Sequence, residues 1–93
     1  MQIQHRHNEK KGMAYVAEAE NILAEMTYVM AGPHKMIIDH TEVSPALEGQ
    51  GVGKKLLEKL VTYARENDIK ILPLCPFAKA TLDRVTEWQD VLA

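Results

Sequence analysis

The sequence contains a single cysteine, few aromatic residues and no long apolar run, and each scarcity excludes a class of protein. Cys75 alone cannot form an internal disulfide, so a disulfide-built secreted scaffold is excluded and a cytoplasmic location is expected. No apolar stretch approaches the roughly 20 residues that cross a bilayer. The first residues also lack the apolar segment of a secretion signal, so we expect no membrane association.

The chain has no excess of positive charge either. Its 11 Lys and Arg residues stand against 13 Asp and Glu residues, and the formal net charge is -2. No overall basic field is therefore present to attract nucleic acid, although a local anion site is not excluded. The 93 residues, 46% of them hydrophobic, predict one folded domain over residues 1–93. A monomer or a weak homodimer is expected, although nothing in the sequence decides between them.

Short strands separated by turns fill the first half of the sequence. Branched and aromatic residues predict strands over Met1 to Arg6, Met13 to Glu18, Ile22 to Ala31 and Met36 to Val43. Turns are expected between them at Asn8 to Gly12, Glu20 to Asn21 and Gly32 to Lys35. A meander of antiparallel strands is the simplest interpretation.

Near Gly53 the spacing of the apolar residues changes from that of strands to that of a helix. Apolar residues recur every three or four positions, at Val52, Leu56, Leu57, Leu60, Val61 and Ala64, and predict a helix that ends near Asn67. A buried strand is expected over Ile69 to Leu74, then a helix over Ala78 to Arg84 and a short turn near Glu87 to Leu92. A strand, a glycine turn, a helix and a strand make a β-α-β unit with two parallel strands. The expected fold class is α+β, with a mixed, mostly antiparallel sheet.

Three glycines at alternate positions, Gly49, Gly51 and Gly53, stand between the fourth strand and the long helix. Glycine allows left-handed backbone conformations and close approach of a ligand. The spacing does not fit a Walker phosphate loop, whose first glycine would fall on Glu48, nor the Gly-x-Gly-x-x-Gly dinucleotide fingerprint. What remains is a loop at a helix N-terminus, where free N–H groups and the helix dipole bind anions. We expect an anion site here, with a plain turn as the alternative.

The run Gly49-Gln50-Gly51-Val52-Gly53 resembles the acetyl-CoA pyrophosphate loop of the GNAT acetyltransferase superfamily. That motif is Arg/Gln-x-x-Gly-x-Gly/Ala, and Glu48 stands where the family usually has Arg or Gln. The segments MIIDHTEVSPALEGQGVGKKLLEKLVTYARENDIKILPLCPFAKA and WQDVL are similar to the compact YjdJ-type branch of the superfamily. The resemblance implies the acyl-CoA N-acyltransferase fold, without the helices that larger members have between their first two strands. It also implies an N-acetyltransferase that takes its acetyl group from acetyl-CoA and passes it to an amine.

The same resemblance implies where acetyl-CoA binds as co-substrate. Its pyrophosphate would meet the glycine loop and Lys54, which opposes the helix dipole by about 0.3 to 1 kcal/mol until an anion binds. Its pantetheine arm would lie along the backbone of Glu42 and Val43, where one N–H would stabilise the oxyanion. Three residues would lie on the far side of that cleft: Pro76, Phe77 and Lys79.

Three side chains could supply proton transfer or nucleophilic catalysis: His40, Glu42 and Cys75. His40 and Glu42 project to one face of a strand, and histidine has an ordinary pKa suited to a base near neutral pH. Cys75, at the end of the next strand, would lie near the thioester sulfur, where it could protonate the leaving thiolate or carry a transient acyl group. Each of the three also has a purely structural interpretation. His40 could be a hydrogen-bonding histidine, Glu42 a solvated glutamate and Cys75 a small buried side chain.

Other functional classes stay open on the sequence alone. His5 and His7 share a strand face, but no third ligand follows at a useful spacing, so no metal site is expected. A CoA-binding module that senses acyl-CoA is the alternative to an enzyme, because the tail lacks the tyrosine that many relatives use as an acid. A structural interaction protein would instead pair through exposed strands such as Met1 to Arg6.

Overall fold

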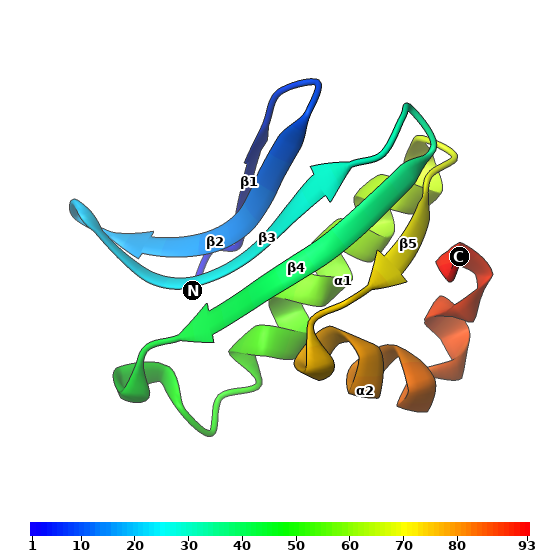
Figure 1. Ribbon diagram of the computed structural model, residues 1–93. Coiled ribbons are helices and arrows are strands. Elements are labelled where there is room, and N and C mark those ends of the chain that lie inside the picture. Colours follow the sequence, from blue (N-terminus) through cyan, green and yellow to red (C-terminus); the bar gives the residue numbers. More distant parts are fainter.

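Five strands form one mixed sheet, with one long helix packed on a single face of it (Figure 1). The computed structural model describes residues 1–93. The strands are β1 (Gln4–His7), β2 (Lys11–Glu18), β3 (Asn21–Met30), β4 (Lys35–Val43) and β5 (Lys70–Pro73). The helices are α1 (Val52–Glu66) and α2 (Pro76–Arg84), and two 3-10 turns are η1 (Pro45–Leu47) and η2 (Thr86–Val91). Neighbouring strands are antiparallel except β4 and β5, which are parallel, so the predicted α+β fold with its β-α-β unit is confirmed.

Several elements begin or end away from the predicted positions. β1 starts at Gln4 and reaches His7, and β2 already begins at Lys11, inside the expected turn. The turn is short because the side chain of Asn8 accepts hydrogen bonds from the N–H groups of Lys10 and Lys11, at 2.8 and 3.1 Å.

The strand β5 and the helix α2 also differ from the expected bounds. β5 ends at Pro73, and Cys75 lies beyond the strand rather than at its end. α2 begins at Pro76 instead of Ala78, because the fixed backbone of proline suits the first position of a helix. Cys75 is consequently the N-cap residue of α2.

The core lies between α1 and one face of the sheet. The buried stripe of α1 is the one predicted from the apolar period and also includes Gly53: Val52, Gly53, Leu56, Leu57, Leu60, Val61 and Ala64. The strands contribute Ala14, Met26, Tyr28, Met36 and Ile38, each no more than 2% exposed. No helix covers the opposite face, seen from the front in Figure 1, which we call the open face. None of the helices has the length and apolar character needed to span a membrane.

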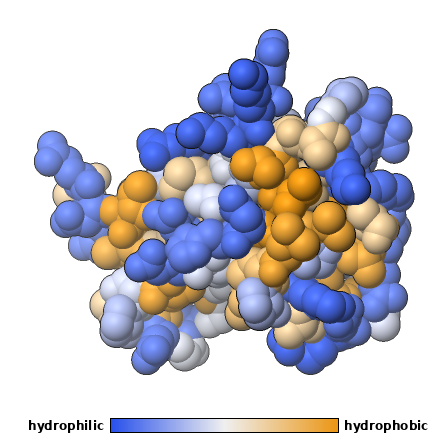
Figure 2. Space-filling model, in the orientation of Figure 1, coloured by the Kyte–Doolittle hydropathy of each residue, from blue (hydrophilic) through white to orange (hydrophobic).

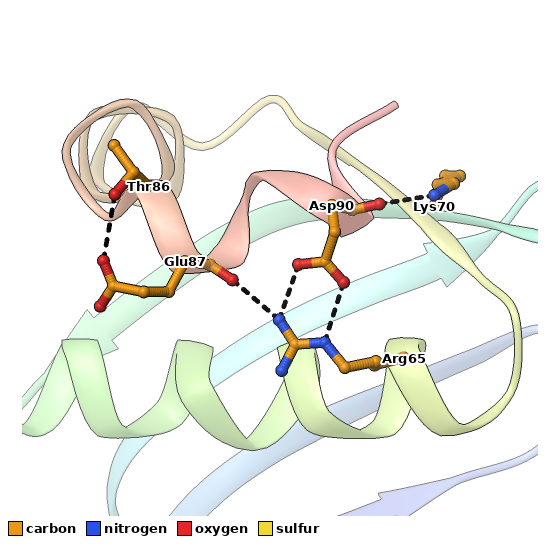
Figure 3. Close-up of polar contacts among 5 residues, drawn as sticks. All are labelled: Arg65, Lys70, Thr86, Glu87 and Asp90. Carbon is orange, nitrogen blue, oxygen red and sulfur yellow. Dashed lines mark hydrogen bonds and ion pairs between the residues drawn. The ribbon is translucent and has the colours of Figure 1, made fainter.

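A network of polar contacts joins the C-terminal tail, which contains η2, to α1 (Figure 3). Arg65 donates two hydrogen bonds to the carboxylate of Asp90, at 2.7 and 2.9 Å, and a third to the backbone oxygen of Glu87 at 2.9 Å. The hydrogen bond from Arg65 holds the pKa of Asp90 below its ordinary value. Lys70 donates to the backbone oxygen of Asp90, and Trp88 is buried in the core. The tail is therefore part of the fold.

His5 lies between the sheet and α1, on the face opposite the open face. Its Nε2 atom is 2.7 Å from the hydroxyl of Tyr28, and its ring meets Tyr63 edge-on with centroids 4.6 Å apart. Burial, with the nearby His7 and Lys59, lowers the pKa of His5 to about 4. Burial, with Tyr63, raises the pKa of Tyr28 to about 12. Both groups are therefore held in their neutral forms.

We expect the free energy of unfolding to fall as the pH is lowered through the window between 6.5 and about 4. In that window the unfolded chain binds a proton at His5 that the folded chain excludes, so acid favours unfolding. The variant His5→Gln keeps a hydrogen-bonding partner for Tyr28 but does not titrate, so it should lose this part of the pH dependence. Urea unfolding of both proteins at about pH 7 and about pH 4.5 measures the difference. An equal pH dependence in the two proteins would contradict the assignment to His5.

Candidate functional site

The two parallel strands β4 and β5 separate part of the way along the sheet. They pair only between residues Lys35 to Ile38 of β4 and Lys70 to Pro73 of β5. The backbone oxygen of Ile38 accepts the last two bonds, from the N–H groups of Leu74 and Cys75 at 3.0 and 3.1 Å. Beyond Ile38 the strand β4 continues to Val43 with no strand on that side. We call this gap between β4 and the start of α2 the split.

The edge of β4 along the split has backbone groups without a neighbouring strand. Ser44 donates its N–H to the oxygen of Leu23, on β3, at 2.7 Å. Since successive residues of a strand turn their backbone groups to alternate sides, those of Thr41 and Val43 are directed to the split. The backbone groups of Glu42, which were expected to lie along the split, are directed to β3 instead. An extended chain could add here through main-chain hydrogen bonds, as a further strand would.

The glycine loop ends at the split, where α1 begins. Gly49 and Gly51 have positive φ angles of 81° and 68°, and Gly51 is the N-cap residue of α1. No side chain caps the helix, and its first intrahelical bond is donated by Lys55 to Gly51 at 3.2 Å. The N–H groups of residues 52–54 consequently lack intrahelical partners, which is the arrangement that binds anions at helix N-termini.

The third glycine of the run has a different task. A Cβ atom at Gly53 would lie 2.6 Å from the ring of Phe77, so glycine lets Phe77 pack directly on the first turn of α1. Pro76 is the first residue of α2, and Lys79 is exposed and paired with Asp83 at 3.3 Å. The contact between Phe77 and Gly53 therefore brings the N-termini of both helices together at the split (Figure 1).

The first turn of α1 presents positive charge that no acidic residue offsets. Lys54 and Lys55 are exposed, and the turn contains no Asp or Glu. The ammonium group of Lys54 lies 6.0 Å from the centre of the Trp88 ring. Glu48 is exposed and precedes the helix, at the end of η1. Two lysines next to unpaired N–H groups suit a ligand with more than one negative charge.

Cys75 occupies the other side of the split and is 6% exposed. Its Sγ atom is 3.1 Å from the hydroxyl of Thr41, across the split. Burial alone would raise the pKa of Cys75, but hydrogen bonds from Thr41 and from the backbone of Ala78 and Phe77 outweigh it and lower the pKa. A lowered pKa increases the fraction of a thiol that is present as the nucleophilic thiolate. Thr41 was not among the residues expected from the sequence, although its place between His40 and Glu42, which face outward, was a signal that it faces inward.

His40 and Glu42 lie on the open face, away from Cys75. Because Thr41 points to Cys75, its two neighbours in the strand point to the other face. The Nε2 atom of His40 is 3.4 Å from a carboxylate oxygen of Glu42, and both side chains are more than half exposed, at 58% and 74%. The predicted shared face of His40 and Glu42 is confirmed. No third ligand joins them, since the chain has no group of three His, Cys, Asp or Glu residues suited to a metal ion.

Comparison with known proteins identifies relatives over nearly the whole chain. A family model described as GCN5-related N-acetyl-transferase matches residues 13–91. The solution structure of a GCN5-like candidate N-acetyltransferase from Staphylococcus aureus is 45% identical, with a TM-score of 0.77, and the match covers 97% of this chain and 87% of that one. No curated protein matches.

Larger structures share the fold at low identity. The ribosomal-protein-alanine N-acetyltransferase of Brucella melitensis is 15% identical, with a TM-score of 0.66 over 84% of this chain and 62% of that one. Tetrahymena GCN5 is 10% identical, with a TM-score of 0.64 over 87% of this chain and 51% of that one. These two likenesses concern the fold alone, and the chain spans between half and two thirds of each structure.

Proposed function

Because the chain belongs to the GCN5-related N-acetyltransferase family, we propose that it transfers an acetyl group from acetyl-CoA to an amine. The observation that carries this proposal is the split, where three features meet. They are the uncapped start of α1, the unpaired edge of β4 and the thiol of Cys75. Each suits one part of a thioester that carries phosphates.

The phosphates are the first part. The free N–H groups of the segment Gly49 to Lys54, which includes Gln50 and Val52, would hold the pyrophosphate at the start of α1. The charge of Lys54 and Lys55 supports this assignment, because a bound anion removes the unfavourable effect of two lysines near a helix N-terminus. Glu48 contributes repulsion in place of the usual cation, so the backbone and the two lysines supply the affinity.

The pantetheine arm is the second part. The unpaired backbone edge of Thr41 and Val43, with Glu42 between them, offers hydrogen bonds to its amide groups. Pro76 and Phe77 would border the arm from the start of α2, with Lys79 one turn further along. An N–H group on the β4 edge would stabilise the oxyanion that forms at the carbonyl carbon during transfer.

The thioester is the third part, and its partner is Cys75. The lowered pKa of Cys75 raises its thiolate fraction above that of an ordinary cysteine, and we assign it nucleophilic attack rather than the donation of a proton. The thiolate would form a bond to the acetyl carbonyl carbon while the bond to the CoA sulfur breaks, and CoA would leave as a thiolate. The acceptor amine would then attack the acetyl-cysteine, lose its proton and release the Cys75 thiolate. A reducing cytoplasm fits this use of a free thiol.

An NMR titration with acetyl-CoA tests the donor half of the proposal. We expect amide shifts concentrated at Gly49 to Lys54, with Gly32, in the turn between β3 and β4, unaffected as an internal control. An absence of shifts in the glycine loop would refute the proposed donor site.

Thiol release in the presence of a panel of amines tests the transfer itself. We expect release that depends on the amine and forms an amide product. Acetyl-CoA binding without release for any amine would instead identify a module that binds acyl-CoA, and this alternative is favoured by the absence of helices over the open face.

A further inference from the structure

A hollow of about 540 Å³ lies on the open face, apart from the split. Its walls come from β1 to β4 and the turn between β1 and β2, and none of its lining residues belongs to α1, α2 or the glycine loop. Its charged lining residues are Arg6, Lys11 and Asp39. The hollow is thus a second concave surface with both signs of charge.

The strand register separates these charges to opposite ends of the hollow. Arg6 on β1 stands opposite Met13 on β2, Met13 opposite Thr27 on β3, and Thr27 opposite His40 on β4. The pairing skips Asp39, which is the extra residue of a bulge in β4. The cations therefore lie at the β1–β2 end and the anion at the β4 end.

The charges at the two ends are available to a ligand. Neither Arg6 nor Lys11 takes part in an ion pair within the chain. The guanidinium group of Arg6 is 5.0 Å from the centre of the Tyr15 ring, which holds it over the open face. Asp39 accepts one hydrogen bond, from the hydroxyl of Thr27 at 2.7 Å, through only one of its two carboxylate oxygens.

The floor between the ends is partly apolar. Met13 and Val29 line the hollow between the two ends. Val29 pairs with Ile37 and Ile37 with Leu72, so an apolar row continues across the sheet beside the hollow. Figure 2 shows apolar side chains gathered over β4 and β5, with hydrophilic ones around the β1–β2 end. Two strand spacings separate β2 from β4, which is about 10 Å.

We propose that this hollow binds the acceptor, and that the acceptor is an amine joined by an apolar chain to an anionic group about 10 Å away. The amine would meet Asp39 and the anionic group would meet Lys11 and Arg6. This inference rests on the proposed acetyl transfer. If it is correct, the open face of the sheet recognises the acceptor substrate.

The position of Asp39 connects the hollow to the split. Asp39 directly follows Ile38, whose oxygen accepts the N–H groups of Leu74 and Cys75. The two sites are close enough that the charge of Asp39 acts on the Cys75 thiol, whose pKa it raises against the larger lowering effect of the hydrogen bonds. His40 lies on the same face and can accept the proton that the amine loses on attack. An amine held at Asp39 would thereby approach the split from the open face, while Cys75 borders the split from the other face.

Amide spectra of the protein without acetyl-CoA test acceptor binding separately from catalysis. The probe is 8-aminooctanoate, and octylamine and octanoate are controls that each lack one charge. We expect 8-aminooctanoate to shift Arg6, Met13, Thr27 and Asp39 and to bind about fivefold more tightly than either control, the effect of an exposed charge pair. Equal affinity of the three compounds, or shifts elsewhere on the chain, would overturn the proposal.

Variants that each remove charge from one end of the hollow test which residues bind the carboxylate and the amine of 8-aminooctanoate. Lys11→Met should weaken the binding of 8-aminooctanoate, and the double variant Arg6→Met/Lys11→Met should reduce it to the affinity of octylamine. Asp39→Asn should reduce it to the affinity of octanoate. Lys35→Met, which removes a strand lysine outside the hollow, is the matched control and should bind as the unmodified chain does. Unchanged affinity in the first two variants would refute the assignment. Because acetyl-CoA binding is read independently at Gly49 to Lys54, a failure of this inference is distinguishable from a failure of the proposed function.

Discussion

Replacing Gly51 by valine should abolish acetyl-CoA binding in a chain that still folds. Gly51 has a φ angle of 68° at the N-cap of α1, where a branched side chain is strained by about 1–2 kcal/mol. Relief of that strain would turn the peptide groups that lead into residues 52–54, and the N–H groups would no longer converge on an anion. We expect affinity to fall at least about 100-fold, equal to about 2.8 kcal/mol, as measured by calorimetric titration.

Gly32→Val is the matched control for this result. Gly32 has a φ angle of 85°, and a Cβ atom there, as at Gly51, would meet nothing within 4 Å. The two substitutions should therefore lower the melting temperature by similar amounts, because the backbone strain is of the same kind. Only Gly51→Val should lose its affinity for acetyl-CoA. If both variants retain affinity, or both lose it, the loop does not act as the phosphate site.

The parts of the fold that the sequence predicted are those encoded by local pattern. The period of the apolar residues located α1, and the glycine run located its start, because each depends on residues close together in the chain. The sequence pattern did not distinguish the structural roles of the three glycines from one another. Gly49 and Gly51 adopt positive φ angles, whereas Gly53 is required by Phe77, which lies 24 residues later and reaches it only through tertiary packing.

The arrangement of the candidate catalytic residues depends on features that a sequence pattern does not contain. His40, Glu42 and Cys75 were each identified by chemical type, and the strand period correctly grouped His40 with Glu42. Their separation from Cys75 depends on where β5 stops pairing and on the bulge at Asp39, both set by contacts between strands. The three candidate residues therefore divide into a thiol on one side of the sheet and a histidine–carboxylate pair on the other.

Replacing Cys75 by alanine should remove acetyl transfer and leave acetyl-CoA binding intact. Cys75 is a small buried side chain whose loss does not touch the glycine loop, so calorimetric affinity should stay within about twofold. Transfer to amines should fall at least about 100-fold, because direct attack on the thioester lacks the positioned nucleophile. Mass spectrometry of the unmodified chain after acid quenching without an amine should show one acetyl group on the peptide that contains Cys75. A fully active Cys75→Ala variant would refute a chemical role for the thiol.

The pH dependence of Thr41→Val separates a nucleophilic thiolate from a proton-donating thiol. Loss of the Thr41 hydroxyl removes a hydrogen bond that lowers the pKa of Cys75, so that pKa should rise. A nucleophilic thiolate then forms at higher pH: the rising limb of the profile of kcat/KM should move to higher pH, with activity recovered under alkaline conditions. If Cys75 donated a proton instead, the same substitution would extend activity on the alkaline side and leave the rising limb in place. Thr62→Val, on the exposed side of α1, is the control and should leave the profile unchanged.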